Sequence, residues 1–115
     1  YSGNDSDTFS IVALGGYGVI SVASHLVGLK IKEMISKTIM GDIAEASALH
    51  HDLMPLFQVL FIVSNPIPVK HALNRMGFPV GIPRLPLLPP DKASAATIES
   101  ALNSYRLDFP TSKKT

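Results

Sequence analysis

Three small residues, Gly16, Gly18 and Ser21, have the Gly-x-Gly-x-x-Ser spacing of turns that hold the phosphates of a dinucleotide. A phosphate-binding fingerprint of this type follows a strand and opens a helix. Here the glycines come before an apolar, β-branched segment, and no GxxxxGKS or GxxxxGKT loop is present. We therefore interpret the glycines as a helix stop with a tight turn and expect no bound cofactor.

The four histidines are the next candidates, because imidazole is a common metal ligand. His50 and His51 are adjacent on a predicted helix, so we expect their side chains to diverge rather than share a ligand face. His25 and His71 stand alone, and the sequence has neither an HExxH motif nor a spaced set of carboxylates. The absence of cysteine excludes disulfides, thiolate nucleophiles and cysteine-ligated zinc. We expect no metal site.

Two backbone segments, the turn 2–5 and the segment 20–22, could line a binding site without special side chains. Barrels and open sheets place their sites at the carboxyl ends of parallel strands, and glycine permits a ligand to approach the backbone closely. A backbone carbonyl can also face a ligand whatever its side chain. The alternative is an ordinary helix-capping turn at 2–5 and plain core at 20–22. Local chemistry alone favours this alternative at both places.

The proline-rich segment 83–89 (PRLPLLP) fits the PxxP spacing of polyproline recognition. Its leucines favour burial over display. We therefore expect an arm that lies over the protein's own surface rather than a ligand for another domain.

The first 40 residues predict a helix, a strand and a second helix. Asn4 or Asp5 can cap the first helix, and the glycine pair that follows Leu14 ends it. Segment 17–22 (YGVISV) is short, apolar and β-branched, which suits a strand buried on both faces. A short turn or a single helical turn at 24–28 leads into a helix over 29–40. The residues expected to face inward on that helix are Ile31, Met34, Ile35 and Ile39.

The remaining residues predict helices only. Asp42 caps a long helix with Glu45 at capping-box spacing, and Pro55 kinks or splits that helix. A proline-initiated helix over 69–76 and a last helix capped by Asp91 follow, before a frayed tail at 111–115. The apolar stripe of the long helix consists of Ala46, Leu49, Leu53, Leu56 and Leu60.

The composition indicates apolar faces that other protein covers. Ten Lys and Arg against nine Asp and Glu weigh against a nucleic-acid or polybasic membrane protein. Charged residues make up 17% of the chain, below the roughly 25% usual for soluble domains. The longest apolar stretch, 53–63, is shorter than the about 20 residues of a membrane span. We therefore expect neither a nucleic-acid partner nor a membrane, but hidden protein contacts.

The predicted strand 17–22 has no partner in the sequence, although an isolated strand cannot satisfy its own backbone groups. The chain also begins at Tyr1 without an initiator methionine, a basic region or an apolar leader. We interpret it as beginning in the middle of a larger fold.

The order of several motifs now becomes informative. YSGND, GGYGVISVASH, GDIAEA, LMPL, NPIPVK and RLPLLPP occur in sequence and cover residues 1–107. In this order they resemble the C-terminal portion of the dihydrodipicolinate synthase branch of the N-acetylneuraminate lyase family, the class I pyruvate aldolases. The resemblance implies an α/β fold. Residues 1–40 would be the C-terminal part of a (β/α)8 TIM barrel, from the end of strand 7 through helix 8, and residues 41–115 a small all-helical domain.

The resemblance also implies a lyase of lysine biosynthesis through diaminopimelate, working as a cytoplasmic homotetramer. Members join pyruvate to aspartate semialdehyde, using a Schiff-base lysine and a relay of tyrosine and threonines. By this resemblance the carbonyl of Ile20 belongs to the pyruvate site, and Gly3 and Asn4 lie at the barrel mouth. The family's catalytic lysine and relay residues sit on earlier strands. We therefore expect substrate-binding residues here but no catalytic one, and an inactive chain without an upstream barrel segment.

A second hypothesis is a non-catalytic helical interaction module derived from this family. Its contact surfaces would be the proline-rich arm and the leucine-rich helix. Circular dichroism and thermal melting distinguish the two, because a free-standing module folds cooperatively on its own.

Overall fold

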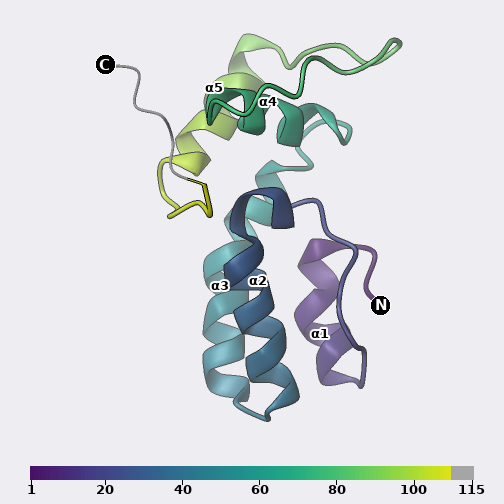
Figure 1. The fold of residues 1–115 in the computed structure, drawn as a ribbon, viewed down its shortest axis with the longest axis vertical. Helices are drawn as coiled ribbons and strands as arrows, with labels where there is room; N and C mark the ends of the chain where they lie inside the picture. Colours follow the sequence, from purple (N-terminus) through teal and green to yellow (C-terminus); the bar gives the residue numbers. More distant parts are fainter. Residues whose placement is uncertain (110–115) are drawn as a thin grey trace.

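Two long helices joined by a short turn form the centre of the computed structural model, which describes residues 1–109. In Figure 1 they stand side by side, with the first short helix next to them and the last two helices above. The elements are η1 (Asp5–Asp7), α1 (Thr8–Ala13), α2 (Ser24–Ile39), α3 (Ile43–Val59), α4 (Ile67–Arg75) and α5 (Lys92–Leu102).

The helix α2 is interrupted near its start. Val27 has non-helical angles, φ −135° and ψ 36°, so the expected turn at 24–28 is a distorted first turn within α2. The carboxylate of Asp108 accepts the amide of Leu29 at 3.0 Å just beyond this break. The inward positions Ile31 and Met34 are buried as predicted. The prediction for Ile39 is wrong, because at the last turn of α2 its side chain is 62% exposed.

The helix α3 buries its predicted apolar stripe, except that Leu49 is partly buried. It continues through Pro55, so this proline does not split the helix, and the alternative of a kink stays a prediction. The predicted capping box is also wrong, because neither carboxylate caps α3. Asp42 binds Lys37 at 3.3 Å, and Glu45 binds the same amine. These bonds to Glu45 and then Asp42 raise the pKa of Lys37. A lysine from the previous helix thus competes successfully for the capping residues.

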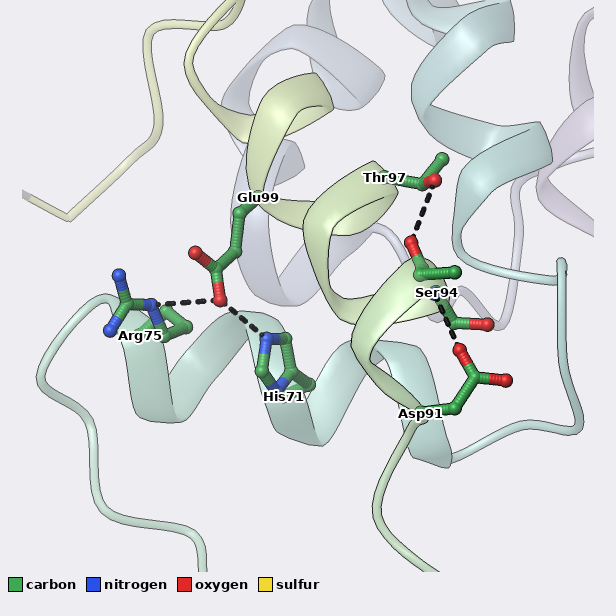
Figure 2. A network of polar contacts seen from close by, with 7 residues as sticks. His71, Arg75, Asp91, Ser94, Thr97 and Glu99 are labelled. Atoms are coloured by element: carbon green, nitrogen blue, oxygen red, sulfur yellow. Dashed lines mark hydrogen bonds and ion pairs between the residues drawn. The ribbon is translucent and has the colours of Figure 1, made fainter.

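The helices α4 and α5 pack against each other. Pro68 lies in the first turn of α4, as the sequence predicts, and Gly77 has φ 86° after the end of that helix. Asp91 caps α5, because its Oδ1 accepts the amide of Ser94 at 2.7 Å. Figure 2 shows this cap together with the contacts of Glu99 on α5 to His71 and Arg75 on α4.

The proline-rich arm between α4 and α5 is extended and exposes two of its three leucines. Leu85 is 82% exposed and Leu88 is 62% exposed, so the expectation that these leucines are buried is wrong. The arm touches the body through other groups, since the amine of Lys70 donates to the carbonyl of Ile82 at 3.2 Å. The predicted frayed tail at 111–115 lies outside the described residues.

The predicted strand 17–22 is not a strand within the described residues. One parallel bridge, between Ser2 and Val19, is all that forms. A strand requires a neighbour along its length, and here only the short segment around Ser2 lies beside it. The α/β fold class is therefore not seen in the described residues themselves, whose regular elements are all helices. The division into residues 1–40 and 41–115 stays a prediction.

A single core joins the last four helices. Its buried members come mainly from α2, α3 and α4, with Ile98 and Leu102 from α5. Partly buried residues, among them Phe9 of α1 and Val19, pack against it. Among the described helices none has both the length and the apolar character for a membrane crossing.

Candidate functional site

The segments 2–4 and 18–20 run parallel and begin a ladder. The amide of Ser2 donates to the carbonyl of Gly18 at 2.8 Å, and the amide of Ile20 donates to the carbonyl of Ser2 at 2.9 Å. In a regular parallel ladder the next bond would join the amide of Asn4 to the carbonyl of Ile20. This third bond is the one that does not form.

The hydroxyl of Ser2 takes the place of the missing partner. It accepts the amide of Asn4 at 3.2 Å and donates to the carbonyl of Asn4 at 2.7 Å. Thr8 in the first turn of α1 donates its hydroxyl to the same carbonyl at 3.1 Å. No described residue donates to the carbonyl of Ile20, which keeps its acceptor capacity for another group.

The carboxylate of Asp5 joins this turn to the segment that follows Ile20. Asp5 is 2% exposed, and its Oδ2 accepts the amides of Val22 at 3.1 Å and Ala23 at 2.9 Å. Its Oδ1 accepts the hydroxyl of Ser21. Hydrogen bonds to an ionised acceptor are stronger than those between neutral groups, so this contact holds the two segments firmly together.

The structure brings the three sequence-predicted site residues together. Ile20 lies beside the Ser2–Asn4 segment, and its side chain is 74% exposed. Gly3 is exposed, and a Cβ added there would meet nothing within 4 Å, which leaves room for a ligand. Asn4 is exposed too, and its side-chain nitrogen Nδ2 donates to the carboxylate of Asp7 at 3.0 Å. Their roles as substrate-binding residues stay predictions.

Sequence reasoning missed the roles of Ser2 and Asp5. Asp5 is one of two residues, with Asn4, that the sequence offers as a cap of the first helix, yet its side chain bonds to groups 16 to 18 residues further along the chain. The hydroxyl of Ser2 acts within its own turn, but its effect is on Ile20 in another segment. No local spacing signals either contact, because both depend on how the two segments are brought together.

An open, mostly apolar pocket of about 590 Å³ begins at Val22, two residues after Ile20. It lies between the start of α2 and α4 and includes His25, Asn65 and Phe78. Lys70 also lines it, and the bond of that amine to the carbonyl of Ile82 occupies one of its hydrogens. None of the lysines in the described part of the chain is buried. A buried amine of the kind whose pKa falls enough to attack a carbonyl is therefore not present among them.

The glycine pair and the adjacent histidines are the remaining candidates from the sequence. Gly15 has φ 104°, and a Cβ on Gly16 would lie 2.6 Å from the side chain of Ile11, so the glycine pair ends α1 as predicted. The rings of His50 and His51 lie 5.3 Å apart, so the expectation that they diverge is wrong. Residues 1–109 hold no group of three or more histidines and carboxylates placed to bind a metal.

Comparison with known proteins identifies the family of this chain. The family model described as "Dihydrodipicolinate synthetase family" matches residues 1–105. The chain belongs to this family. A 4-hydroxy-tetrahydrodipicolinate synthase of Dehalococcoides mccartyi (strain ATCC BAA-2266) is 54% identical over 110 residues, 96% of this chain and 37% of that protein. The protein of the same name from Thermosynechococcus vestitus is 50% identical over 107 residues, 93% of this chain and 36% of that protein.

Solved structures of the dihydrodipicolinate synthetase family share the fold. The dihydrodipicolinate synthase of Aquifex aeolicus matches with a TM-score of 0.89 at 38% identity, over 97% of this chain and 38% of that one. The enzyme of Cyanidioschyzon merolae with lysine bound matches with a TM-score of 0.88 at 42% identity, over 90% of this chain and 35% of that one. The resemblance drawn from the sequence is confirmed, and the chain spans just over a third of the length of these relatives.

Proposed function

We propose that this chain is the C-terminal portion of a 4-hydroxy-tetrahydrodipicolinate synthase. Such an enzyme condenses pyruvate with aspartate semialdehyde on the route to lysine through diaminopimelate. The identity of 54% over nearly the whole chain to a protein of that name carries this assignment. The complete enzyme would be a cytoplasmic homotetramer that requires no cofactor.

The proposal places residues 1–40 at the end of a (β/α)8 barrel, from strand 7 through helix 8, and residues 41–115 in a helical domain. The parallel bridge between Ser2 and Val19, with α1 in between, supports this arrangement, because neighbouring strands of such a barrel are parallel and joined by a helix. A barrel of this type needs about 250 residues. An upstream segment would therefore complete it and cover the exposed side chains near this site, such as Tyr17.

The carbonyl of Ile20 would contribute to the pyruvate site as a hydrogen-bond acceptor. Condensation through a Schiff base passes through a carbinolamine hydroxyl and a protonated imine, and both are donors. An acceptor without a protein partner at the end of a barrel strand can bind either donor. Gly3 leaves the approach to this point open, and Asn4 lies beside it at the barrel mouth.

The lysine that forms the Schiff base would come from the upstream segment. A nucleophilic lysine is activated by removal from water or by a neighbouring cation. The lysines of the described residues lie at the surface, and Lys30 and Lys37 are bound to carboxylates. The chain alone is therefore expected to be inactive.

Steady-state assay of the complete protein tests this proposal. Pyruvate and aspartate semialdehyde are supplied together, and consumption of both is followed. We expect turnover with this pair and much slower turnover when another aldehyde replaces aspartate semialdehyde. A folded complete protein that does not condense the pair would contradict the proposal.

A further inference from the structure

We infer that Asp5 is a positioning residue, which fixes the carbonyl of Ile20 by holding the peptide groups that follow it. The inference rests on the function proposed above, in which that carbonyl binds a substrate-derived group. Asp5 itself does not touch substrate in this role, because it is 2% exposed and both its oxygens are bonded to protein.

The peptide group of Ile20 is held from two sides. Before it, the amide of Ile20 is bonded to the carbonyl of Ser2 at 2.9 Å. After it, the carboxylate of Asp5 binds the hydroxyl of Ser21 and the amides of Val22 and Ala23. The free carbonyl lies between these anchors, so its direction depends on both of them. If either anchor is removed, the two rotatable backbone angles on that side, φ and ψ, are no longer fixed by the protein, and solvent and substrate set them instead.

The chemistry of the three donors favours a carboxylate at this position. An ionised carboxylate offers acceptors on both oxygens, whereas the amide of asparagine carries two hydrogens on one side. In Asp5→Asn the side-chain nitrogen, which carries these two hydrogens, would face either the hydroxyl of Ser21 or the amides of Val22 and Ala23. With the nitrogen toward Ser21, the hydroxyl would have to turn and accept, and its own hydrogen would lose the carboxylate as acceptor. With the nitrogen toward the amides, both amides would lose their acceptor, although the side chain has nearly the same size.

A competing explanation is that Asp5 only stabilises the start of α2. Ala23 lies directly before that helix, and a negative charge near a helix N-terminus is favourable. Loss of stability alone reduces the concentration of active enzyme and hence the apparent kcat. It does not change the pyruvate concentration at which the remaining enzyme is half saturated. The Michaelis constant for pyruvate therefore separates a positioning role from a purely structural one.

The first experiment measures the KM for pyruvate and the melting temperature of the complete protein and its variant Asp5→Asn. We expect KM to rise roughly tenfold, which corresponds to the loss of one hydrogen bond to a charged group. Leu53→Ala, in the core between α2 and α3, is the matched control for lost stability, and we expect a lower melting temperature with an unchanged KM. Glu33→Gln, an exposed carboxylate on α2, is the control for lost charge.

If Asp5→Asn does not fold, a second pair of variants tests the positioning role of Asp5. Ser21→Ala removes one donor from Asp5, while Ser21→Thr keeps a hydroxyl there. We expect Ser21→Ala to raise KM for pyruvate severalfold and Ser21→Thr to restore it. An unchanged KM in Asp5→Asn, or in Ser21→Ala where that variant alone is available, would overturn the inference. A wild-type protein without condensing activity would instead overturn the proposed function on which it rests.

Discussion

The backbone amide of Asn4 is bonded to the hydroxyl of Ser2, at 3.2 Å, within a single tight turn. This bond ends the parallel ladder one step early, since the carbonyl of Ile20 would otherwise receive that amide. A buried serine therefore determines whether a backbone acceptor in another segment is free.

Ser2→Ala should weaken pyruvate binding in the complete protein. Without the hydroxyl, the amide of Asn4 has no local acceptor and turns to the carbonyl of Ile20 to avoid an unsatisfied bond. We expect the KM for pyruvate to rise severalfold in steady-state assays. Ser10→Ala, an exposed serine on α1, should leave KM unchanged. Equal values of KM for wild type and Ser2→Ala would show that the hydroxyl does not keep the carbonyl free.

Glu99 should couple α4 to α5. Its Oε1 lies 2.9 Å from Nε2 of His71 and 3.2 Å from Nε of Arg75. Figure 2 shows how Glu99 reaches both side chains. Because these side chains are partly exposed, a double-mutant cycle of His71→Ala and Glu99→Ala should give a coupling free energy of about 0.5 kcal/mol in chemical unfolding. Strictly additive effects of the two substitutions would mean that the contact contributes nothing to stability.

Protonation of His50 should destabilise the packing of α1 on α3. Burial, and secondarily the neighbouring His51, lower the pKa of His50 below its ordinary 6.5. Its Nδ1 is buried and has no hydrogen-bond partner among residues 1–109, and its ring lies 5.3 Å from that of Phe9. A pKa lowered by folding means that stability is complete above the unfolded pKa and is lost as the pH falls through the folded pKa.

The variant His50→Leu should therefore lose less stability than wild type between pH 7.5 and pH 5, measured as the shift in melting temperature. His25→Gln, at an exposed position, is the control and should follow the wild-type curve. Parallel curves for wild type and His50→Leu would show that His50 does not cause the acid sensitivity.

Asp91 should stabilise α5 through its ionised form. The pKa of Asp91 is lowered, first by the backbone amide of Ser94, so its contribution is present above the ordinary value of 3.8 and is lost as the pH falls through the lowered value. At pH 7, Asp91→Ala should melt below wild type, while Asp91→Asn, which can still cap but carries no charge, should melt between the two. The gap between wild type and Asp91→Ala should shrink toward pH 3, and a gap independent of pH would contradict this assignment.

Local signals predicted most of the helix boundaries. Three features each depend on a few neighbouring residues, so the sequence displays them directly: the positive φ of Gly15, Pro68 in the first turn of α4, and the cap at Asp91. The failures are of another kind. Asp42 does not cap α3 because Lys37, from the preceding helix, binds its carboxylate instead.

The site, too, was predictable only in part, because some of its contacts join segments that are distant in the sequence. Ile20, Gly3 and Asn4 were placed through the order of motifs, and the structure brings them together. The roles of Asp5 and Ser2 were not predicted, because both act on the separate segment 20–23. No spacing rule of the sequence predicts such contacts. The predicted strand at 17–22 failed because strand pairing requires neighbours that the described residues do not supply.

The central claim is that this chain supplies an acceptor for the pyruvate site while another segment supplies the nucleophile. Borohydride reduction in the presence of pyruvate, followed by mass spectrometry of the intact protein and its peptides, tests it most directly. The 115-residue chain alone should remain unlabelled, and the complete protein should gain one pyruvate adduct on a lysine outside residues 1–115. An adduct on a lysine of this chain, such as Lys70, would contradict the account.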